Sequence, residues 1–420
     1  MRVVRTEHSP QVGHADTGPT GAAVDQAPPA STAPSPDTGQ VGVAWVREHG
    51  RDGKWTRQRA AEGQMPSLAR ARRALQQGRI PHVTDVLLPG AVQALFATEA
   101  AQLAPRHRGM RIETLPAEAS DQVRLELFYS PHRQAPAGTK ELAPVASPIA
   151  GAHATRPCAD CPFCGPPLRG HSLQWRGLRV LPNAFPYARS ESQHLLLLPV
   201  DHREQNFEPS FFRDVLALQR RLGPSTRVHF NGKAGNSQPH LHSHAHQEPL
   251  PLEQKLGIAR SQLDELLRLG DATLSSYAFS PLRGLLLEGS EDDVTRLAQR
   301  VVDVLEADPT VQGRYNMVLL QRLTAAPDRG RLVIAPRRSD TLSLEVPGVG
   351  VVKGGALDAV GRRTVSAASV SDEEIAAWRL FLERTLVPAD EIPGLRTLVE
   401  ENDSTCPPSV YSPWQTRISD

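Results

Sequence analysis

The sequence lacks a hydrophobic run long enough to cross a membrane. A membrane-spanning helix needs about 20 consecutive apolar residues, whereas the apolar runs here, such as Leu195–Leu198, have the length of a strand. The first residues, MRVVRTEHSP, also lack the apolar centre of a secretory signal. These absences predict a cytoplasmic protein that makes no use of a membrane.

The chain also lacks an excess of charge of either sign. Its 420 residues include 47 basic and 46 acidic side chains, which gives a formal net charge of +1. A protein that coats nucleic acid needs an extended basic surface, so the balance argues against a nucleic-acid partner. Any phosphate-binding character must be local. The hydrophobic share of 39% is enough for one large domain or two medium ones.

Cysteine is scarce, with four residues in the chain, which is too few for a disulfide framework. Cys158, Cys161 and Cys164 lie together in CADCPFCG, and such clustering favours metal binding in a reducing compartment. A C-x-x-C pair has the spacing of a zinc site but needs two further ligands. Three free thiols, or an iron–sulfur site short of a fourth cysteine, are the alternatives.

Composition divides the chain into five segments. Residues 1–40 are rich in Pro, Ala, Thr and Gly, which predicts a disordered tail. Residues 41–117 read as a helical extension, with helices over LARARRALQQG and AVQALFATEAAQL. Residues 118–256 and 257–400 each read as an α+β half, and residues 401–420 form a C-terminal tail.

The two halves share a pattern of apolar strands and one long helix. The first half predicts strands at VRLELFYSPHR, 178–186, 194–200, TRVHFN and from His240, with a helix over PSFFRDVLALQRRL. The second half predicts helices over SQLDELLRL and DDVTRLAQRVVDVLEA, followed by adjacent strands at YNMVLLQRL and RLVIAPR.

The segment AGNSQPHLHSHAHQE, residues 234–248, carries the strongest chemical signal. Alternate side chains of a strand share a face, so four histidines are expected to point the same way. Hydrophobic packing needs no such row. A polar surface or a purely metal-binding tract is the alternative. The histidines are His240, His242, His244 and His246.

Phosphate chemistry is favoured over these alternatives because imidazole is nucleophilic near neutral pH. Small residues precede the histidines, and backbone N–H groups around Gly235 and Ser237 can approach phosphate oxygens closely.

SQPHLHSH resembles the active-site strand of the histidine-triad and galactose-1-phosphate uridylyltransferase superfamily, which includes diadenosine tetraphosphate and GDP-galactose phosphorylases. Its signature is His-x-His-x-(Gln or His), with the middle histidine as nucleophile. The resemblance implies that His242 is the nucleophile and that Ser237 and Gln238 fix this register. His244 occupies the position at which the transferases have Gln. A histidine at this third position of the signature is typical of the hydrolase branch. A shifted register would make His244 the nucleophile.

The resemblance also implies a structural zinc ion. In the uridylyltransferases a C-x-x-C pair is completed by a histidine after a strand and by the first histidine of the nucleophile motif. Carried over, zinc binds Cys161, Cys164, His202 and His240, with Cys158 as a competing ligand.

Further segments resemble the substrate-binding parts of the same superfamily. LFYSPHRQAP nominates Arg133, whose planar fork suits phosphate oxygens. LPNAFPYARSE nominates a nucleoside pocket, and VVKGGALD nominates a lysine near the acceptor or a phosphate. The residues implied to bind substrate are Arg133, Asn183, Phe185, Asn231, Gly235, Gln238 and Lys353.

The predicted fold class is α+β, with duplicated histidine-triad-like halves that are each an antiparallel sheet with packed helices, plus the disordered N-terminal tail. The predicted function is a nucleotidyltransferase or phosphorylase acting on a nucleoside diphosphate sugar or dinucleoside polyphosphate through a nucleotidyl-histidine. Phosphate or a sugar 1-phosphate is the expected acceptor. A histidine-triad nucleotide hydrolase is the alternative enzyme, and a zinc-stabilised nucleotide-binding protein is the alternative without catalysis.

Overall fold

The chain forms two units, Met1–Met65 and Pro66–Asp420. The first contains an antiparallel hairpin of β1 (Trp45–His49) and β2 (Trp55–Arg59). The extension predicted to be helical over 41–117 thus begins with strands, because tryptophan, valine and threonine favour extended backbone. The computed structural model describes residues 45–49, 55–59, 67–117, 119, 122–131, 163, 172–184, 186–189, 193–234, 240–323 and 325–405, and the predicted tail over 1–40 lies outside them.

The second unit begins with two helices that the sequence predicts. Helix α1 (Leu68–Gln76) starts after Ser67, whose hydroxyl accepts a hydrogen bond from Arg70 N at 3.2 Å, as an N-cap should. It ends just before Gly78, which has a positive φ of 64°. Helix α2 (Leu88–His107) extends further on both sides than its predicted core.

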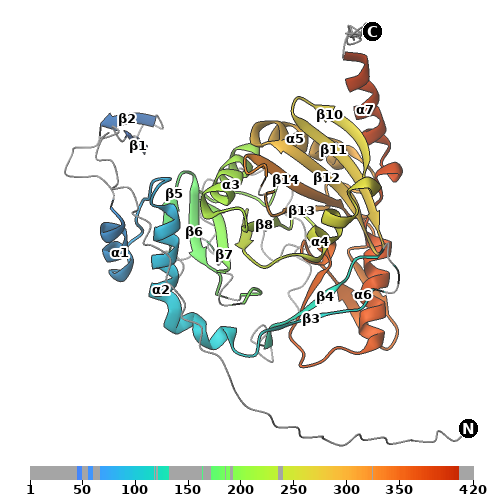
Figure 1. Ribbon diagram of the computed structural model, residues 1–420, viewed down its shortest axis with the longest axis horizontal. Helices are drawn as coiled ribbons and strands as arrows, with labels where there is room; N and C mark the ends of the chain where they lie inside the picture. The colour runs from blue at the N-terminus through green and yellow to red at the C-terminus, as the bar shows by residue number, and fades with distance from the viewer. Residues whose placement is uncertain are drawn as a thin grey trace, which may run out of the picture. The chain divides into compact units, whose positions relative to one another are not determined.

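A ten-stranded antiparallel sheet forms the centre of the second unit (Figure 1). Its order is β10-β11-β12-β14-β13-β8-β9-β7-β6-β5. The bounds are β5 (Leu173–Trp175), β6 (Leu178–Pro182), β7 (Leu195–Pro199), β8 (Arg227–Phe230), β9 (Ser243–His246), β10 (Asp264–Leu269), β11 (Ala272–Phe279), β12 (Leu282–Ser290), β13 (Tyr315–Leu319) and β14 (Arg329–Pro336).

The strand order reads the same from either edge of this sheet. From one edge it runs β5-β6-β7-β9-β8, and from the other β10-β11-β12-β14-β13. A helix separates the third and fourth strands of each set in the chain, α3 (Pro209–Leu222) in one and α5 (Glu291–Ala307) in the other. Strands β8 and β13 pair at the middle, with His229 opposite Val318. The mixed α+β class with antiparallel strands is as predicted.

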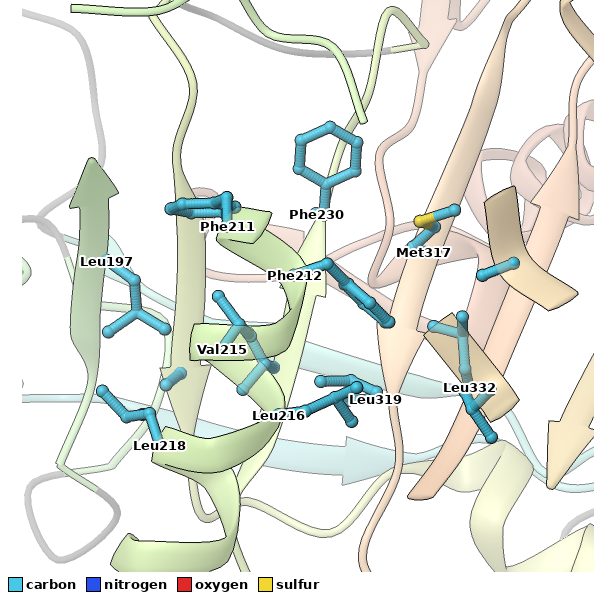
Figure 2. Packing of buried hydrophobic residues seen from close by; sticks show 14 of the residues in the cluster. Leu197, Phe211, Phe212, Val215, Leu216, Leu218, Phe230, Met317, Leu319 and Leu332 are labelled. Atoms are coloured by element: carbon cyan, nitrogen blue, oxygen red, sulfur yellow. The ribbon is translucent and has the colours of Figure 1, made fainter. Parts of the chain in front are cut away.

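Helices α3 and α5 pack on one face of the sheet and on each other. Figure 2 shows Phe212 and Leu216 of α3 among Met317, Leu319 and Leu332 of the central strands. Burial of each such side chain stabilises the fold by about 1.5–3 kcal/mol. Both helices lie where the apolar spacing predicts them.

The opposite face of the sheet is covered differently in its two halves. In the second half a large apolar core joins strands β11 to β14 to helices and to a three-stranded sheet of order β17-β4-β3. In the first half the apolar cluster is small and contains Leu181, Leu196 and Leu198 with Phe163. The covering elements are α4 (Pro251–Ile258), α6 (Asp372–Thr385), β3 (Arg111–Thr114), β4 (Glu126–Tyr129) and β17 (Arg362–Val365).

The prediction of a helix over SQLDELLRL is wrong. This segment forms a single 3-10 turn, Arg260–Gln262, followed by strand β10. The leucine spacing fits a helix, but Gly270 and Asp271 make a two-residue hairpin that pairs Leu269 with Ala272. Gly270 has a φ of +59°, which such turns require. Pairing with the long strand β11 therefore overrides the local periodicity.

No helix in the described part of the chain is long and apolar enough to span a membrane.

The remaining elements come after β14 in the chain. These elements are β15 (Ser343–Val346), β16 (Gly350–Lys353), the 3-10 turns Asp358–Val360 and Ala389–Glu391, and α7 (Pro393–Thr405).

Candidate active site

Strand β9 and the residues before it form a row of histidines on the sheet face away from α3 and α5. Leu241 and Ala245 point into the helix-covered core, so the intervening histidines face the other side. The rings of His242 and His244 are 5.2 Å apart, and His244 stacks on His229 of β8 at 4.8 Å. The alternation predicted from the sequence therefore gathers the imidazoles on one surface.

His242 is held in one tautomer by its own backbone neighbour. Its Nδ1 lies 2.7 Å from the carbonyl oxygen of His240. Because a carbonyl oxygen only accepts, Nδ1 must carry the proton, and the lone pair is on Nε2. Burial lowers the pKa of His242, opposed by this hydrogen bond. The imidazole is therefore neutral and nucleophilic at neutral pH.

The backbone of His242 is clamped by Gln205, a residue that the sequence did not nominate. His242 N donates to Gln205 Oε1 at 2.8 Å, and Gln205 Nε2 donates to His242 O at 3.2 Å. Leu241 N also donates to Arg203 O at 2.7 Å. The segment after β7 thus fixes the position of the histidine motif. No local sequence pattern marks a glutamine for this role.

His244 belongs to a buried polar cluster that the sequence revealed only in part. Its Nδ1 lies 3.2 Å from His194 Nε2, and the phenolic hydroxyl of Tyr187 contacts His229 Nε2. Two other members of the cluster are visible in the sequence. His194 stands directly before the apolar strand β7, and His229 alternates with Arg227 in β8. A single histidine in a strand seldom indicates a site, so neither position predicts the cluster by itself.

Asn183 lies in this same cluster. Its side-chain nitrogen is 3.2 Å from His194 Nε2, and its backbone N donates to His194 O at 2.9 Å. The predicted nucleoside-pocket residue and the histidine row are therefore connected through His194.

His202 and His240 form a pair that fits a shared metal ion. Their Nδ1 atoms are 3.1 Å apart, and two nitrogens on one tetrahedral zinc at 2.0–2.1 Å lie about 3.3 Å apart. Burial, with His202 nearby, lowers the pKa of His240 to about 3. It is therefore neutral at pH 7, as a metal ligand must be.

Phe163 lies close to this pair. It stands between the two predicted cysteine ligands in the sequence, and its ring centroid is 5.8 Å from His240 and 5.1 Å from His242. Among the described residues no group of three metal-binding side chains occurs. The predicted site residues outside the described part of the chain are Cys161, Cys164, Arg133, Phe185, Gly235, Ser237 and Gln238.

A loop of the second half, which contains Gly355 and Ala356, is hydrogen-bonded to Asn231. The side-chain oxygen of Asn231 accepts a hydrogen bond from Ala356 N at 2.8 Å, and Asn316 Nδ2 donates to Asn231 O at 2.8 Å. A Cβ at Gly355 would lie 2.9 Å from Asn231 Oδ1, so a larger residue there would displace the Asn231 side chain. Gly355 and Ala356 thus lie directly beside the turn that leads to the histidine motif, whereas Lys353 is an exposed residue at the end of β16.

His246, at the end of β9, makes stability depend on pH. Its pKa lies well below the usual value because burial disfavours the charged ring, with added repulsion from His229 and His194. Below about pH 6.5 the unfolded chain binds a proton that the folded chain does not. We therefore expect the free energy of unfolding to fall by up to about 1.4 kcal/mol per pH unit below pH 6.5 for this residue. Urea unfolding at several pH values between about 5 and 8 measures it.

The His246→Gln variant identifies the source of this dependence. Gln does not titrate, so the variant should lose less stability on acidification, with a slope smaller by about one proton. An unchanged slope would assign the effect to other groups.

No family model matches this sequence, and no curated protein matches it. Among solved structures, a yeast Ap4A phosphorylase in complex with Ap4A is similar with a TM-score of 0.44 and 16% identity, covering 71% of this chain and 96% of that one. A DUF4931 family protein from Bacillus cereus has a TM-score of 0.30 and 12% identity, covering 49% of this chain and 94% of that one. At these values neither structure assigns an activity to this chain.

Proposed function

We propose that this chain is a nucleotidyltransferase or phosphorylase that forms a covalent nucleotidyl intermediate on His242. The observation that carries the proposal is the 2.7 Å hydrogen bond from His242 Nδ1 to the carbonyl of His240. It leaves Nε2 as the nucleophilic atom in a backbone clamped by Gln205.

The chemistry proceeds in two displacements. In the first, Nε2 attacks the α-phosphorus of a nucleoside diphosphate sugar or a dinucleoside polyphosphate. A P–N bond forms, the P–O bond to the leaving phosphate group breaks, and that group leaves with the electron pair. In the second, an oxygen of phosphate or of a sugar 1-phosphate attacks the same phosphorus, and the P–N electron pair returns to Nε2. The His240 carbonyl stabilises the positive charge on the ring between the two steps.

The neighbouring residues are proposed to bind and orient the substrate. His244, whose Nδ1 lies 3.2 Å from His194 Nε2, is proposed to donate a hydrogen bond to a phosphate oxygen. Backbone groups at Gly235 and Ser237 would donate to equatorial oxygens. Arg133, Gln238 and Lys353 are proposed to contact phosphate. Asn183 and Phe185 are proposed to contact the nucleoside. Asn231 is proposed to hold the turn that lies beside the nucleophile.

A structural zinc is part of the proposal. Cys161, Cys164, His202 and His240 would hold it, and the ion would supply a fixed link between the cysteine segment and the histidine strand. By holding His240, this link keeps its carbonyl in place behind His242.

The matching strand orders of the two sheet halves support an internal duplication of a histidine-triad-like unit. The proposed nucleophile lies in the first copy, and the second copy contributes the loop of Gly355 and Ala356, whose backbone N at Ala356 donates to Asn231 Oδ1.

A nucleotide hydrolase is the second candidate. His244 stands where the transferases of the resembled superfamily have glutamine, and its contact with His194 provides a second imidazole that can pass a proton. Water would then replace phosphate as the acceptor.

Mass spectrometry of the intact protein tests the proposal. Purified chain is mixed with a panel of nucleoside diphosphate sugars and dinucleoside polyphosphates, with and without phosphate. We expect an acid-labile adduct of one nucleoside monophosphate on the peptide that contains His242. Discharge by phosphate identifies a phosphorylase, and discharge by water alone identifies a hydrolase. No adduct with any member of the panel would favour a zinc-stabilised nucleotide-binding protein.

A further inference from the structure

The second half of the sheet contains a hollow that the proposed chemistry does not use. Its volume is about 330 Å³, compared with about 20 and 70 Å³ for two smaller cavities. This volume falls at the lower end of the range for small-molecule sites. The lining residues are Arg260, Leu263, Glu265, Thr273, Ser275, Glu288, Leu323, Arg329 and Arg331.

The hollow lies on the same face of the sheet as the histidine row. His229 pairs with Val318, which belongs to the apolar core on that face together with Val333. Arg331 is two residues before Val333 on β14 and therefore points the same way. Glu288 pairs with Arg331 and continues the row.

The hollow also uses the strands that correspond to the active-site half. Its sheet residues come from β10, β11, β12 and β14. By strand order these occupy the places that β5, β6, β7 and β9 have in the first half. Where β9 carries histidines, β14 carries Arg329 and Arg331.

The three arginines retain hydrogen-bond donors for a ligand. Arg331 is 5% exposed and donates through Nε to Glu288 at 2.8 Å and through Nη1 to the carbonyl oxygen of Gln321 at 3.3 Å. Arg260 also bonds Glu288, and through one nitrogen only, within the described part of the chain. Arg329 binds Asp271 through its two terminal nitrogens. Each guanidinium has five N–H donors, and Arg260 and Arg331 share the single carboxylate of Glu288. The three arginines therefore have more donors than these contacts use.

We propose that this hollow binds a small phosphate monoester without reacting with it. The phosphate would lie among Arg260, Arg329 and Arg331, because the guanidinium fork matches phosphate oxygens. Glu265, Thr273 and Ser275 offer acceptors and hydroxyls to the remainder of the ligand, and Leu263 and Leu323 offer apolar contact. Among the described residues no histidine or cysteine lines the hollow, so it contains neither of the nucleophiles on which the proposed nucleotidyl transfer or a thiol mechanism would depend.

Titration calorimetry on the full chain carrying His242→Ala tests the proposal, since this substitution prevents turnover of the ligand. The probes are a nucleoside monophosphate, a hexose 1-phosphate and inorganic phosphate, injected separately. In this background we compare Arg260→Gln/Arg329→Gln with Arg296→Gln. The control removes an exposed arginine of α5 that is paired with Asp293 and lies outside the hollow.

At least one of the two esters should bind, and the double variant should weaken that binding at least tenfold or remove one binding site per chain. The control should match its parent. The ester that binds more tightly identifies the source of the phosphate. Equal binding by the double variant and its parent, or no binding by either ester, would overturn the proposal. Adduct formation on the wild-type chain is measured separately, so a failure of the proposed catalysis leaves this result intact.

Discussion

Replacing His242 with alanine is expected to abolish the nucleotidyl adduct and to reduce turnover by at least about 10⁴-fold. The substitution removes the nucleophilic Nε2, and the nearby rings cannot take its place because His244 is rotated toward His194. Intact-protein mass spectrometry and a steady-state assay on the substrate found in the panel provide the two measurements.

The His242→Gln and His244→Gln variants make this test selective. His242→Gln keeps a side chain of similar volume in the buried position and should be as inactive as alanine, which separates lost chemistry from a lost fold. His244→Gln should still form the adduct and should discharge it to phosphate more readily relative to water. An adduct that survives in both His242 variants but disappears in His244→Gln would show that the shifted register is the true one.

Loss of zinc is the second large effect that we expect. His202→Ala removes one of two imidazole nitrogens that lie 3.1 Å apart. The zinc content should fall from about one ion per chain to well below half, and the melting temperature should fall clearly, because the energy of binding a structural zinc contributes directly to folding. Elemental analysis and thermal unfolding, each with and without a chelator, measure these changes.

Cys158→Ala is the matched control for the metal site. The proposed ligand set predicts that this variant keeps its zinc, whereas Cys161→Ala loses it. Full zinc content in His202→Ala, or its loss in Cys158→Ala, would require a different ligand set.

The sequence predicts the fold well where a segment has a clear periodicity. Helix α3 begins at Pro209 and ends before Gly223, and the strands at β7, β13 and β14 lie where apolar runs are bounded by proline or polar residues. The pattern fails at β10, where leucines at helical spacing form a strand. The Gly270-Asp271 turn signal competes there with the periodicity, and only the partner strand decides between them.

The candidate site, like the fold, is predictable from the sequence only in its local features. Alternation along one strand is a local property, so the shared face of His242 and His244 follows from the sequence. The clamp by Gln205, the contact of Asn183 with His194, and the approach of Gly355 to Asn231 join segments far apart in the chain. Such contacts depend on the order of strands in the sheet, which a single sequence does not specify.

The β8–β13 pairing makes the two halves dependent on each other. Each of these strands would be an exposed edge if the chain were divided near residue 257, and unpaired edges invite association with other chains. His229 lies on β8 at this seam and stacks on His244. Unfolding of the second half would therefore remove a supporting neighbour from the strand that carries the proposed catalytic imidazoles. We expect such a change to impair the fold and the proposed chemistry together.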